Sequence, residues 1–204
     1  MRRNPFSTRF IRPGQIPFQF SAGHSANELW SAVASPGAQW AIVGPHGSGK
    51  STLLEMLASG WQAHGLTEQR VRLTAARKRE SIPWGTLDEN SLLVIDGFEQ
   101  LAWWRQRWVR YRCHQKRVRL LVTCHADCGV PILLRTEATW PLAYTLAGML
   151  LACDATPYED QLHAIWQEAP GNIRDFFFRL YHWCESCGIY QAEQANSIRQ
   201  SLSI

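Results

Sequence analysis

Apolar residues follow two patterns along this chain, short continuous runs and helical spacings, and the two alternate between residues 25 and 140. Continuous runs at 39–43 (QWAIV), 91–96 (SLLVID) and 118–123 (VRLLVT) predict strands, and the second suits a strand buried on both faces. An alternating stretch at 69–75 and a short run at 132–134 predict two further strands. Strands that alternate with helices indicate a parallel sheet in an α/β core.

One helix is predicted before the first of these strands, and two more are predicted between them. Ser25 and Glu28 have the spacing of a capping box, and a helix is expected to start there. Residues 50–64 carry apolar side chains at helical spacing, with Gly65 as the C-terminal stop. The third helix is expected at 98–114. Its packing face is predicted to consist of Leu101, Trp104, Trp108 and Tyr111.

From Pro141 onward the pattern is helical only. Helices are predicted at 142–153, from 156 to the break at Pro170-Gly171, from the capping residue Asn172 to 186, and weakly at 191–201. The beginning of the chain has prolines and aromatics without periodicity. We therefore expect an irregular arm at 1–24, a three-layer α/β/α core with a mainly parallel sheet at 25–140, and a small helical lid at 141–204.

Residues 44–52 (GPHGSGKST), between the first predicted strand and the next helix, match the pattern G-x-x-x-x-G-K-S of the phosphate-binding P-loop. Glycines let backbone N–H groups turn toward phosphate oxygens, and the helix that follows directs its positive end at the anion. Lys50 is expected to reach the β- and γ-phosphates as a catalytic residue, and Ser51 to bind Mg²⁺. The residues predicted to bind nucleotide are Gly44, Pro45, His46, Gly47, Ser48, Gly49, Lys50, Ser51 and Thr52.

Asp96 ends the apolar run at 91–96, the pattern of a Walker B strand. A carboxylate at this place lies beside the P-loop and holds Mg²⁺ directly or through water. The guanine-reading motif N-K-x-D is absent from the sequence, which favours ATP over GTP. The sequence thus predicts a P-loop NTPase whose cofactors are ATP and Mg²⁺, with Ser51 and Asp96 as metal ligands.

The residues after Asp96 resemble the D-G-h-D-E-L segment of NACHT and other STAND ATPases. Here the segment reads DGFEQL, so Gly97 stands where most AAA+ enzymes have an acid, and Glu99 comes three residues after Asp96. The resemblance implies that Glu99 is the catalytic carboxylate that activates water. The alternative is that Glu99 is a favourable negative charge in the first turn of a helix.

Two other segments resemble the sensor motifs of AAA+ ATPases. Residues 121–125 (LVTCH) resemble sensor 1, which implies that Thr123 or His125 touches the γ-phosphate. Residues 170–175 (PGNIRD) resemble the G-N-h-R sensor 2 motif of AAA+ lids, which implies that Arg174 reaches back to the phosphates. The LSGGQ signature of ABC ATPases is absent between the two Walker motifs, so a true ABC ATPase is disfavoured.

Composition sets limits on location and chemistry. The 204 residues suffice for one domain with a small appended lid. Because no apolar run is long enough to span a bilayer and the N-terminus lacks a signal-peptide core, no membrane span and a cytoplasmic location are expected. Cys184-x-x-Cys187 suggests metal or redox chemistry, but no second CxxC completes a ligand set, and structural thiols are favoured.

The net charge of +4 is unevenly distributed, since residues 101–119 contain seven basic residues and no acid. Three interpretations stay open for this basic helix. It contacts nucleic acid with its tryptophans stacking on bases, it supplies an arginine to the ATP site of a neighbouring subunit in a homo-oligomer, or it is a solvated face.

The function favoured by the sequence is an Mg²⁺-dependent ATPase of AAA+/STAND type that couples its nucleotide state to lid movement and to a partner. Two alternatives remain. One is a P-loop kinase that phosphorylates a small molecule or nucleotide. The other is a nucleotide-gated binding module that does not hydrolyse ATP, because the acid directly after Asp96 is missing.

Overall fold

The structure is a computed structural model that describes residues 4–7, 11–20, 23–77, 81–151 and 155–187. The chain divides into two compact units, one formed by residues 17–137 and the other by residues 1–16 together with 138–204. The boundaries expected from the sequence, after residues 24 and 140, stay predictions. The weak helix predicted at 191–201 lies outside the described residues.

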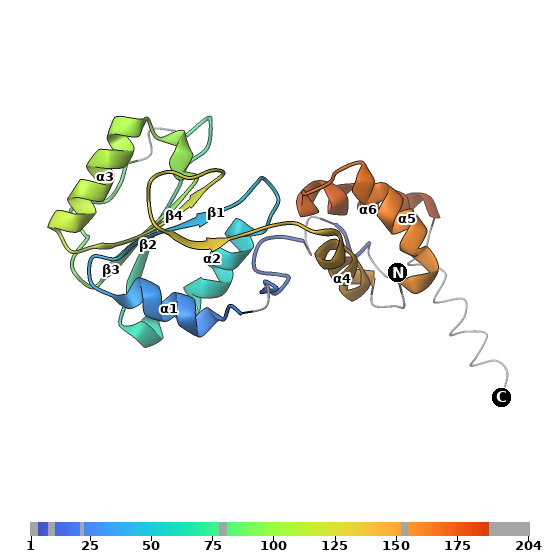
Figure 1. Ribbon diagram of the computed structural model, residues 1–204, viewed down its shortest axis with the longest axis horizontal. Coiled ribbons are helices and arrows are strands. Elements are labelled where there is room, and N and C mark those ends of the chain that lie inside the picture. Colours follow the sequence, from blue (N-terminus) through green and yellow to red (C-terminus); the bar gives the residue numbers. More distant parts are fainter. Residues whose placement is uncertain (1–3, 8–10, 21–22, 78–80, 152–154, 188–204) are drawn as a thin grey trace. The chain divides into compact units, whose positions relative to one another are not determined.

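A five-stranded sheet forms the centre of the unit 17–137 (Figure 1). All of its pairings are parallel, and the strand order is β2-β3-β4-β1-β5. β4 has every residue buried and β3 every residue but the last, which agrees with their continuous apolar sequences. The strands are β1 (Gln39–Val43), β2 (Thr67–Arg72), β3 (Ser91–Asp96), β4 (Arg119–Cys124) and β5 (Ile132–Arg135).

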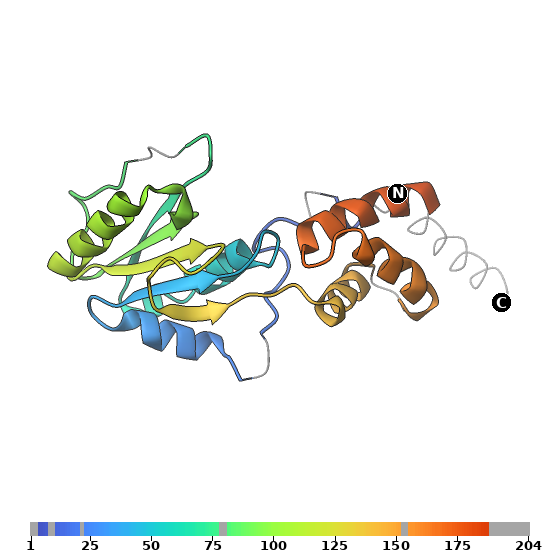
Figure 2. The ribbon, with the colours of Figure 1, turned by 45° about the horizontal axis from the view of Figure 1, so that its top comes forward.

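Helices cover both faces of this sheet (Figure 2). Alternate residues of the central strands point to opposite faces. Leu92 and Leu121 pack in one cluster with α1 (Ala26–Ala34) and α2 (Lys50–Ala58). Leu93 and Leu120 pack in the other cluster with α3 (Trp103–Gln115). The predicted three-layer α/β/α core with a parallel sheet is confirmed.

The capping box predicted at the start of α1 is present. Ser25 Oγ accepts a hydrogen bond from the Glu28 amide at 3.4 Å, and Glu28 Oε2 accepts one from the Ser25 amide at 3.1 Å. Two of the four N-terminal amides that lack a partner within the helix therefore have side-chain acceptors.

α2 ends at Ala58, earlier than the residue 64 expected from the sequence. The indole of Trp30 donates to the Leu57 carbonyl at 3.0 Å and occupies the space beside Gly60. A Cβ on residue 60 would lie 2.2 Å from the Trp30 ring, so only glycine allows this approach. A short 3₁₀ turn, Gln62–His64, follows and closes at Gly65 in the left-handed conformation.

The helix predicted at 98–114 consists of two elements. A 3₁₀ turn, Phe98–Gln100, is separated from α3 by Leu101, which has an extended backbone. Because the helix begins after Leu101, the packing face predicted from that residue is wrong. Val109 and Cys113 face the sheet instead, whereas Trp104, Trp108 and Tyr111 are exposed.

The second unit is a cluster of helices that also contains the beginning of the chain. Phe6 is buried in its core with its ring centroid 5.7 Å from that of Phe177, and Asn4 Nδ2 donates to the Tyr181 carbonyl at 2.9 Å. The predicted cap Asn172 accepts the amide of Asp175 at 3.2 Å. The elements are α4 (Trp140–Leu151), a 3₁₀ turn (Thr156–Tyr158), α5 (Glu159–Gln167) and α6 (Ile173–Cys187). Cys184, buried, and Cys187, exposed, both lie on α6.

Among the residues that the structure describes, no helix combines the length and the apolar character needed to cross a bilayer.

Burial of Phe6 predicts that the N-terminal arm stabilises the helical unit. We expect Phe6→Ala to lower the free energy of unfolding by about 3 kcal/mol, because it leaves a cavity among aromatic side chains. Phe178→Ala is the matched control, since that ring is 61% exposed and its loss is expected to change stability by less than about 0.5 kcal/mol. Urea unfolding followed by far-ultraviolet circular dichroism measures both. Equal losses in the two variants would contradict the assignment of the arm to this unit.

Candidate nucleotide-binding site

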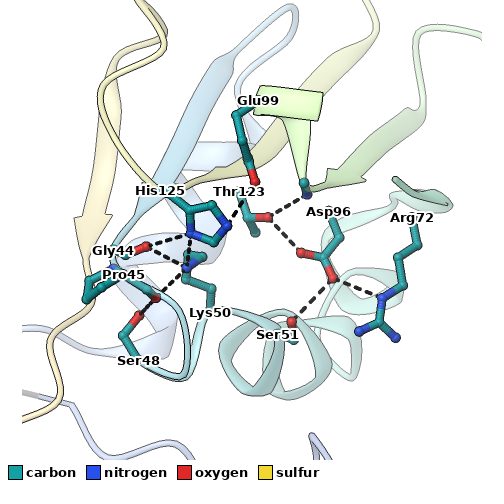
Figure 3. A network of polar contacts seen from close by, with 11 residues as sticks. Gly44, Pro45, Ser48, Lys50, Ser51, Arg72, Asp96, Glu99, Thr123 and His125 are labelled. Carbon is teal, nitrogen blue, oxygen red and sulfur yellow. Dashed lines mark hydrogen bonds and ion pairs between the residues drawn. The ribbon is translucent and has the colours of Figure 1, made fainter. Parts of the chain in front are cut away.

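The strand order brings the predicted site residues to one edge of the sheet. β4 lies between β1 and β3, and all three strands run in the same direction. The P-loop follows β1, Asp96 ends β3, and His125 follows β4, so their side chains meet at the carboxyl edge (Figure 3). Crevices outside the carboxyl ends of parallel strands are where ligands bind in α/β proteins.

The P-loop is fixed to the end of β5. Ser48 Oγ lies 2.7 Å from Thr136 Oγ1 and donates to the Pro45 carbonyl at 2.8 Å. Gly44 is enclosed between these groups, because a Cβ there would lie 2.2 Å from Thr136 Oγ1 and 2.8 Å from Ser48 Oγ. α2 then begins at Lys50 with no side chain capping it, which leaves its first amides available to an anion.

The Lys50 ammonium group is buried against the carbonyl groups of the P-loop. Nζ donates to the Gly44 carbonyl at 2.5 Å and to the Pro45 carbonyl at 2.7 Å. It also lies 3.2 Å from Nδ1 of His125. A phosphate bound by this lysine therefore has to take the place of loop carbonyls around Nζ.

Asp96 is held by hydroxyl groups from two directions. Ser51 donates to its Oδ2 at 3.3 Å, and Thr123 donates to its Oδ1 at 2.7 Å. The Thr123 hydroxyl in turn accepts the Gly97 amide at 2.9 Å. Arg72, at the end of β2, is 3.7 Å from Oδ2.

Ser51 and Asp96 fit the requirements of Mg²⁺, which prefers hydroxyl, carboxylate and water oxygens. Thr123 uses its hydroxyl on Asp96 and on the Gly97 amide and is almost completely buried, so its observed contacts orient the carboxylate. Its contact with a γ-phosphate stays a prediction, as do those of the P-loop residue Thr52 and of Arg174. Arg174 lies exposed in the first turn of α6 in the helical unit.

Gly97 explains why no acid follows Asp96 directly. Its φ is +88°, and a Cβ would lie 2.6 Å from the Leu73 carbonyl oxygen. An L-residue with a side chain is strained at this φ and collides with the backbone after β2. The nearest carboxylate after Asp96 is therefore Glu99, in the following 3₁₀ turn.

Glu99 and Lys50 both contact the same imidazole. His125 Nε2 lies 3.0 Å from Glu99 Oε1, while its Nδ1 faces Lys50. The second carboxylate oxygen of Glu99, Oε2, is buried and has no hydrogen-bond partner among the described residues. A buried oxygen of this kind is open to a water or a ligand hydroxyl. The His46 ring of the P-loop packs on His125 with centroids 3.6 Å apart.

Sequence reasoning missed three contributors to this site. Thr136 and Arg72 come from strands at opposite edges of the sheet, and only the strand order shows that they face the P-loop and Asp96. The third is the role of His125 as the link between Glu99 and Lys50. Its position after β4 indicated that His125 lies near the phosphates, but not that it contacts Glu99 and Lys50.

A pair of cysteines lies beside the site, at the end of β4 and in the loop after it. The thiol of Cys124 forms a hydrogen bond with Cys128, which lowers the pKa of Cys128 to about 7 although burial acts in the opposite direction. The same hydrogen bond, together with burial, raises the pKa of Cys124. Burial alone raises the pKa of Cys113 to about 12.

Known proteins resemble this chain in the sequence around the P-loop and in the fold. A sequence model of a family described as ABC transporter matches residues 30–108, which contain the P-loop and Asp96. The fold is similar to that of the replication initiator DnaA bound to AMPPCP and single-stranded DNA, with a TM-score of 0.60, 12% identity, and coverage of 90% of this chain and 68% of that one. It is also similar to AMPPCP-bound DnaA from Aquifex aeolicus, with a TM-score of 0.52, 11% identity and the same coverage. DnaA is an AAA+ ATPase. A search of curated proteins finds no matching sequence.

The lowered pKa of Cys128 predicts a pH-dependent reactivity beside the site. We expect iodoacetamide to alkylate Cys128 at a rate that rises as the pH passes through about 7, because the thiolate is the reactive form. Cys113, with a pKa of about 12, should stay unmodified over the same range. Peptide mass spectrometry of samples quenched over time measures each thiol separately.

Removing the hydrogen-bond donor provides the control. Cys124→Ala should return the pKa of Cys128 toward its ordinary value of 9.0. At pH 7 its thiolate fraction then falls ~50-fold, but the more basic thiolate is ~10-fold more nucleophilic, so the alkylation rate should fall about 5-fold. Cys184→Ala should leave the rate unchanged. A Cys128 rate that does not respond to Cys124→Ala would refute the hydrogen bond as the cause.

Proposed function

We propose that this chain, a P-loop NTPase that resembles the AAA+ ATPases, binds ATP with Mg²⁺ and hydrolyses it to change its contact with a partner. One observation carries the proposal. A buried lysine, an oriented aspartate and a glutamate all lie at the carboxyl edge of one parallel sheet, and one buried oxygen of the glutamate has no hydrogen-bond partner among the described residues. These are the groups that phosphate binding, metal binding and water activation require.

The P-loop would bind the triphosphate. Lys50 exchanges the Gly44 and Pro45 carbonyls for phosphate oxygens, to which an ammonium forms stronger, charge-assisted hydrogen bonds. The uncapped first turn of α2 adds backbone amides and the positive end of its dipole. The two structural neighbours hold the ATP analogue AMPPCP, which supports a nucleoside triphosphate as the ligand.

Ser51 and Asp96 would hold the Mg²⁺, which neutralises charge on the phosphates during transfer. Their oxygens already face each other at 3.3 Å. Thr123 fixes the rotation of the Asp96 carboxylate, so that Oδ2 remains directed at Ser51 while Oδ1 accepts the threonine hydroxyl.

Glu99 would orient the attacking water and accept its proton. Its buried oxygen Oε2 would receive the proton as the water oxygen bonds to the γ-phosphorus, and the bond from that phosphorus to the β–γ bridging oxygen would break, giving ADP and phosphate. His125 holds the other oxygen, Oε1, and keeps the carboxylate near Lys50. His125 is therefore a positioning residue in this proposal.

Coupling to a partner is the remaining part of the proposal. Arg174, in the first turn of α6, would read the phosphates, so that nucleotide state changes the helical unit. Candidate partners for the basic helix α3 are a nucleic acid, a protein, or a second copy of this chain.

A second candidate function rests on Gly97. Without an acid directly after Asp96, the chain would bind ATP and act as a nucleotide-gated module with no turnover. The two functions differ in the role of Glu99, which is catalytic in the first and a structural partner of His125 in the second.

Phosphate release from Mg-ATP by wild type, Lys50→Ala and Glu99→Gln tests the proposal. We expect wild type to release phosphate without any acceptor molecule, which would count against the kinase alternative. Glu99→Gln should lower kcat by about 10²- to 10⁴-fold while ATP affinity is retained, because the amide cannot accept a proton. Lys50→Ala should lose ATP binding as well. ATP affinity is measured separately with a fluorescent analogue.

Glu89→Gln is the matched control, since Glu89 is an exposed glutamate in the loop before β3. It should retain full turnover. ATP binding without phosphate release in wild type would overturn hydrolysis and favour the nucleotide-gated module. Full turnover by Glu99→Gln would remove Glu99 from the mechanism.

The contact between Thr123 and Asp96 predicts a specific metal phenotype. Thr123→Val preserves shape but removes the hydroxyl, so the Mg²⁺ concentration for half-maximal turnover should rise about 10- to 100-fold. Thr67→Val, on the exposed edge strand β2, should leave it unchanged. A Mg²⁺ titration of ATPase activity at saturating ATP measures the shift. A lower kcat with unchanged Mg²⁺ dependence would show that Thr123 acts elsewhere.

A further inference from the structure

α3 presents a row of aromatic side chains away from the sheet. Trp104, Trp108 and Tyr111 follow one another at i, i+4 and i+7, so they lie along one face of the helix. They are 59%, 46% and 60% exposed, whereas Val109 and Cys113 on the opposite face are buried. Trp103, at the start of the helix, is 73% exposed.

Trp84, from the segment between β2 and β3, packs against the middle ring of this row. Its ring packs edge-on against Trp108 with centroids 5.2 Å apart. The Arg112 guanidinium lies 5.6 Å from the centroids of both rings. We call Trp84, Trp104, Trp108 and Tyr111 the α3 aromatic face. Because Trp84 and Trp108 are held by these contacts, they lose little further freedom when a ligand stacks on them.

The same helix carries a strong positive charge. Arg105, Arg107, Arg110 and Arg112 belong to α3, and Lys116 and Arg117 follow it directly. No acidic residue occurs between 101 and 119, so this segment itself supplies no opposite charge. Arg107 and Arg117 are exposed. Guanidinium groups closely spaced along a helix attract a polyanion over several phosphate spacings.

Exposed rings and arginines together define the occupant. Arginines alone would suit any acidic surface, but an acidic peptide would leave the indole faces in water. In double-stranded nucleic acid the base faces are already stacked on one another and cannot reach these rings. In a single strand the unpaired bases supply flat apolar surfaces and the phosphates supply the charge, and proteins bind such strands with this combination of groups.

We infer that the α3 aromatic face binds single-stranded nucleic acid, with bases stacked on its rings and phosphates paired with the arginines of α3. Stacking and phosphate pairing do not read the sugar, so DNA and RNA single strands should bind with similar affinity. This binding does not require the nucleotide site. It therefore stands or falls separately from ATP hydrolysis.

The test is fluorescence anisotropy of labelled oligothymidine and oligouridine, each about 20 nucleotides long and thus longer than the ~4–16 nucleotides bound by one single-strand-binding fold. The full chain is titrated without ATP or Mg²⁺ over a series of NaCl concentrations. We expect binding that weakens with salt and is retained in Lys50→Ala. Trp104→Ala should weaken it about 5- to 150-fold, whereas Trp104→Phe, which keeps a ring, should lose much less. Arg107→Ala should reduce the slope of log affinity against log salt by about 0.7.

Two control variants remove a ring and an arginine outside α3. Phe178→Ala removes an equally exposed ring on α6, and Arg12→Ala removes an exposed arginine of the N-terminal segment. Neither should alter binding, and circular dichroism verifies that every variant is folded.

Several results would overturn the inference. They are no binding of either strand at low salt, equal losses in the controls, a strict preference for one sugar, or tighter binding of duplex than of single strands. If Trp104→Ala dissociates an oligomer and leaves strand binding unchanged, the face is instead a contact between copies of this chain. Capture of an acidic peptide with higher affinity than either strand would likewise assign the face to a protein.

Discussion

The parallel pairing of β4 between β1 and β3 is the constraint on which the site depends. It places the strand ending in Thr123 and Cys124 between the P-loop and Asp96. The Thr123 hydroxyl then reaches Asp96. Two residues later, the His125 ring reaches both Lys50 and Glu99. Any other neighbour for β3 would leave the Asp96 carboxylate without the donor that fixes its rotation.

This constraint also explains why the site is largely polar although the strands are almost completely apolar. The middle positions of β3 (92–95) and β4 (120–122) carry only apolar side chains and are completely buried, so the groups that could carry chemistry lie toward the carboxyl edge. There the buried Lys50 is stabilised by loop carbonyls, and Glu99 retains an oxygen with no hydrogen-bond partner among the described residues. The buried middle of the sheet is rigid, whereas the polar groups at its carboxyl edge would exchange their partners when a ligand binds.

Local signals in the sequence predicted most of the fold. The capping box at Ser25, the apolar run at 91–96 and the P-loop glycines each depend on contacts within a few residues, so pattern and spacing were sufficient. The end of α2 was not predictable, because it depends on Trp30 occupying the space beside Gly60. The orientation of α3 was predicted wrongly, since the helical phase was counted from Leu101, which lies outside the helix. Thr136 beside Ser48 and Phe6 beside Phe177 depend on tertiary structure alone.

The left-handed backbone of Gly97 limits how this protein can change through mutation. An acidic residue in place of Gly97, next to Asp96, would have a strained φ, and its Cβ would collide with the Leu73 carbonyl oxygen. The substituted chain would have to move the end of β2 before the new carboxylate became useful. Under the proposed mechanism, changes in turnover are therefore accessible mainly through position 99 and its histidine partner. The backbone after β2 separates this arrangement of carboxylates from one with an acid directly after Asp96.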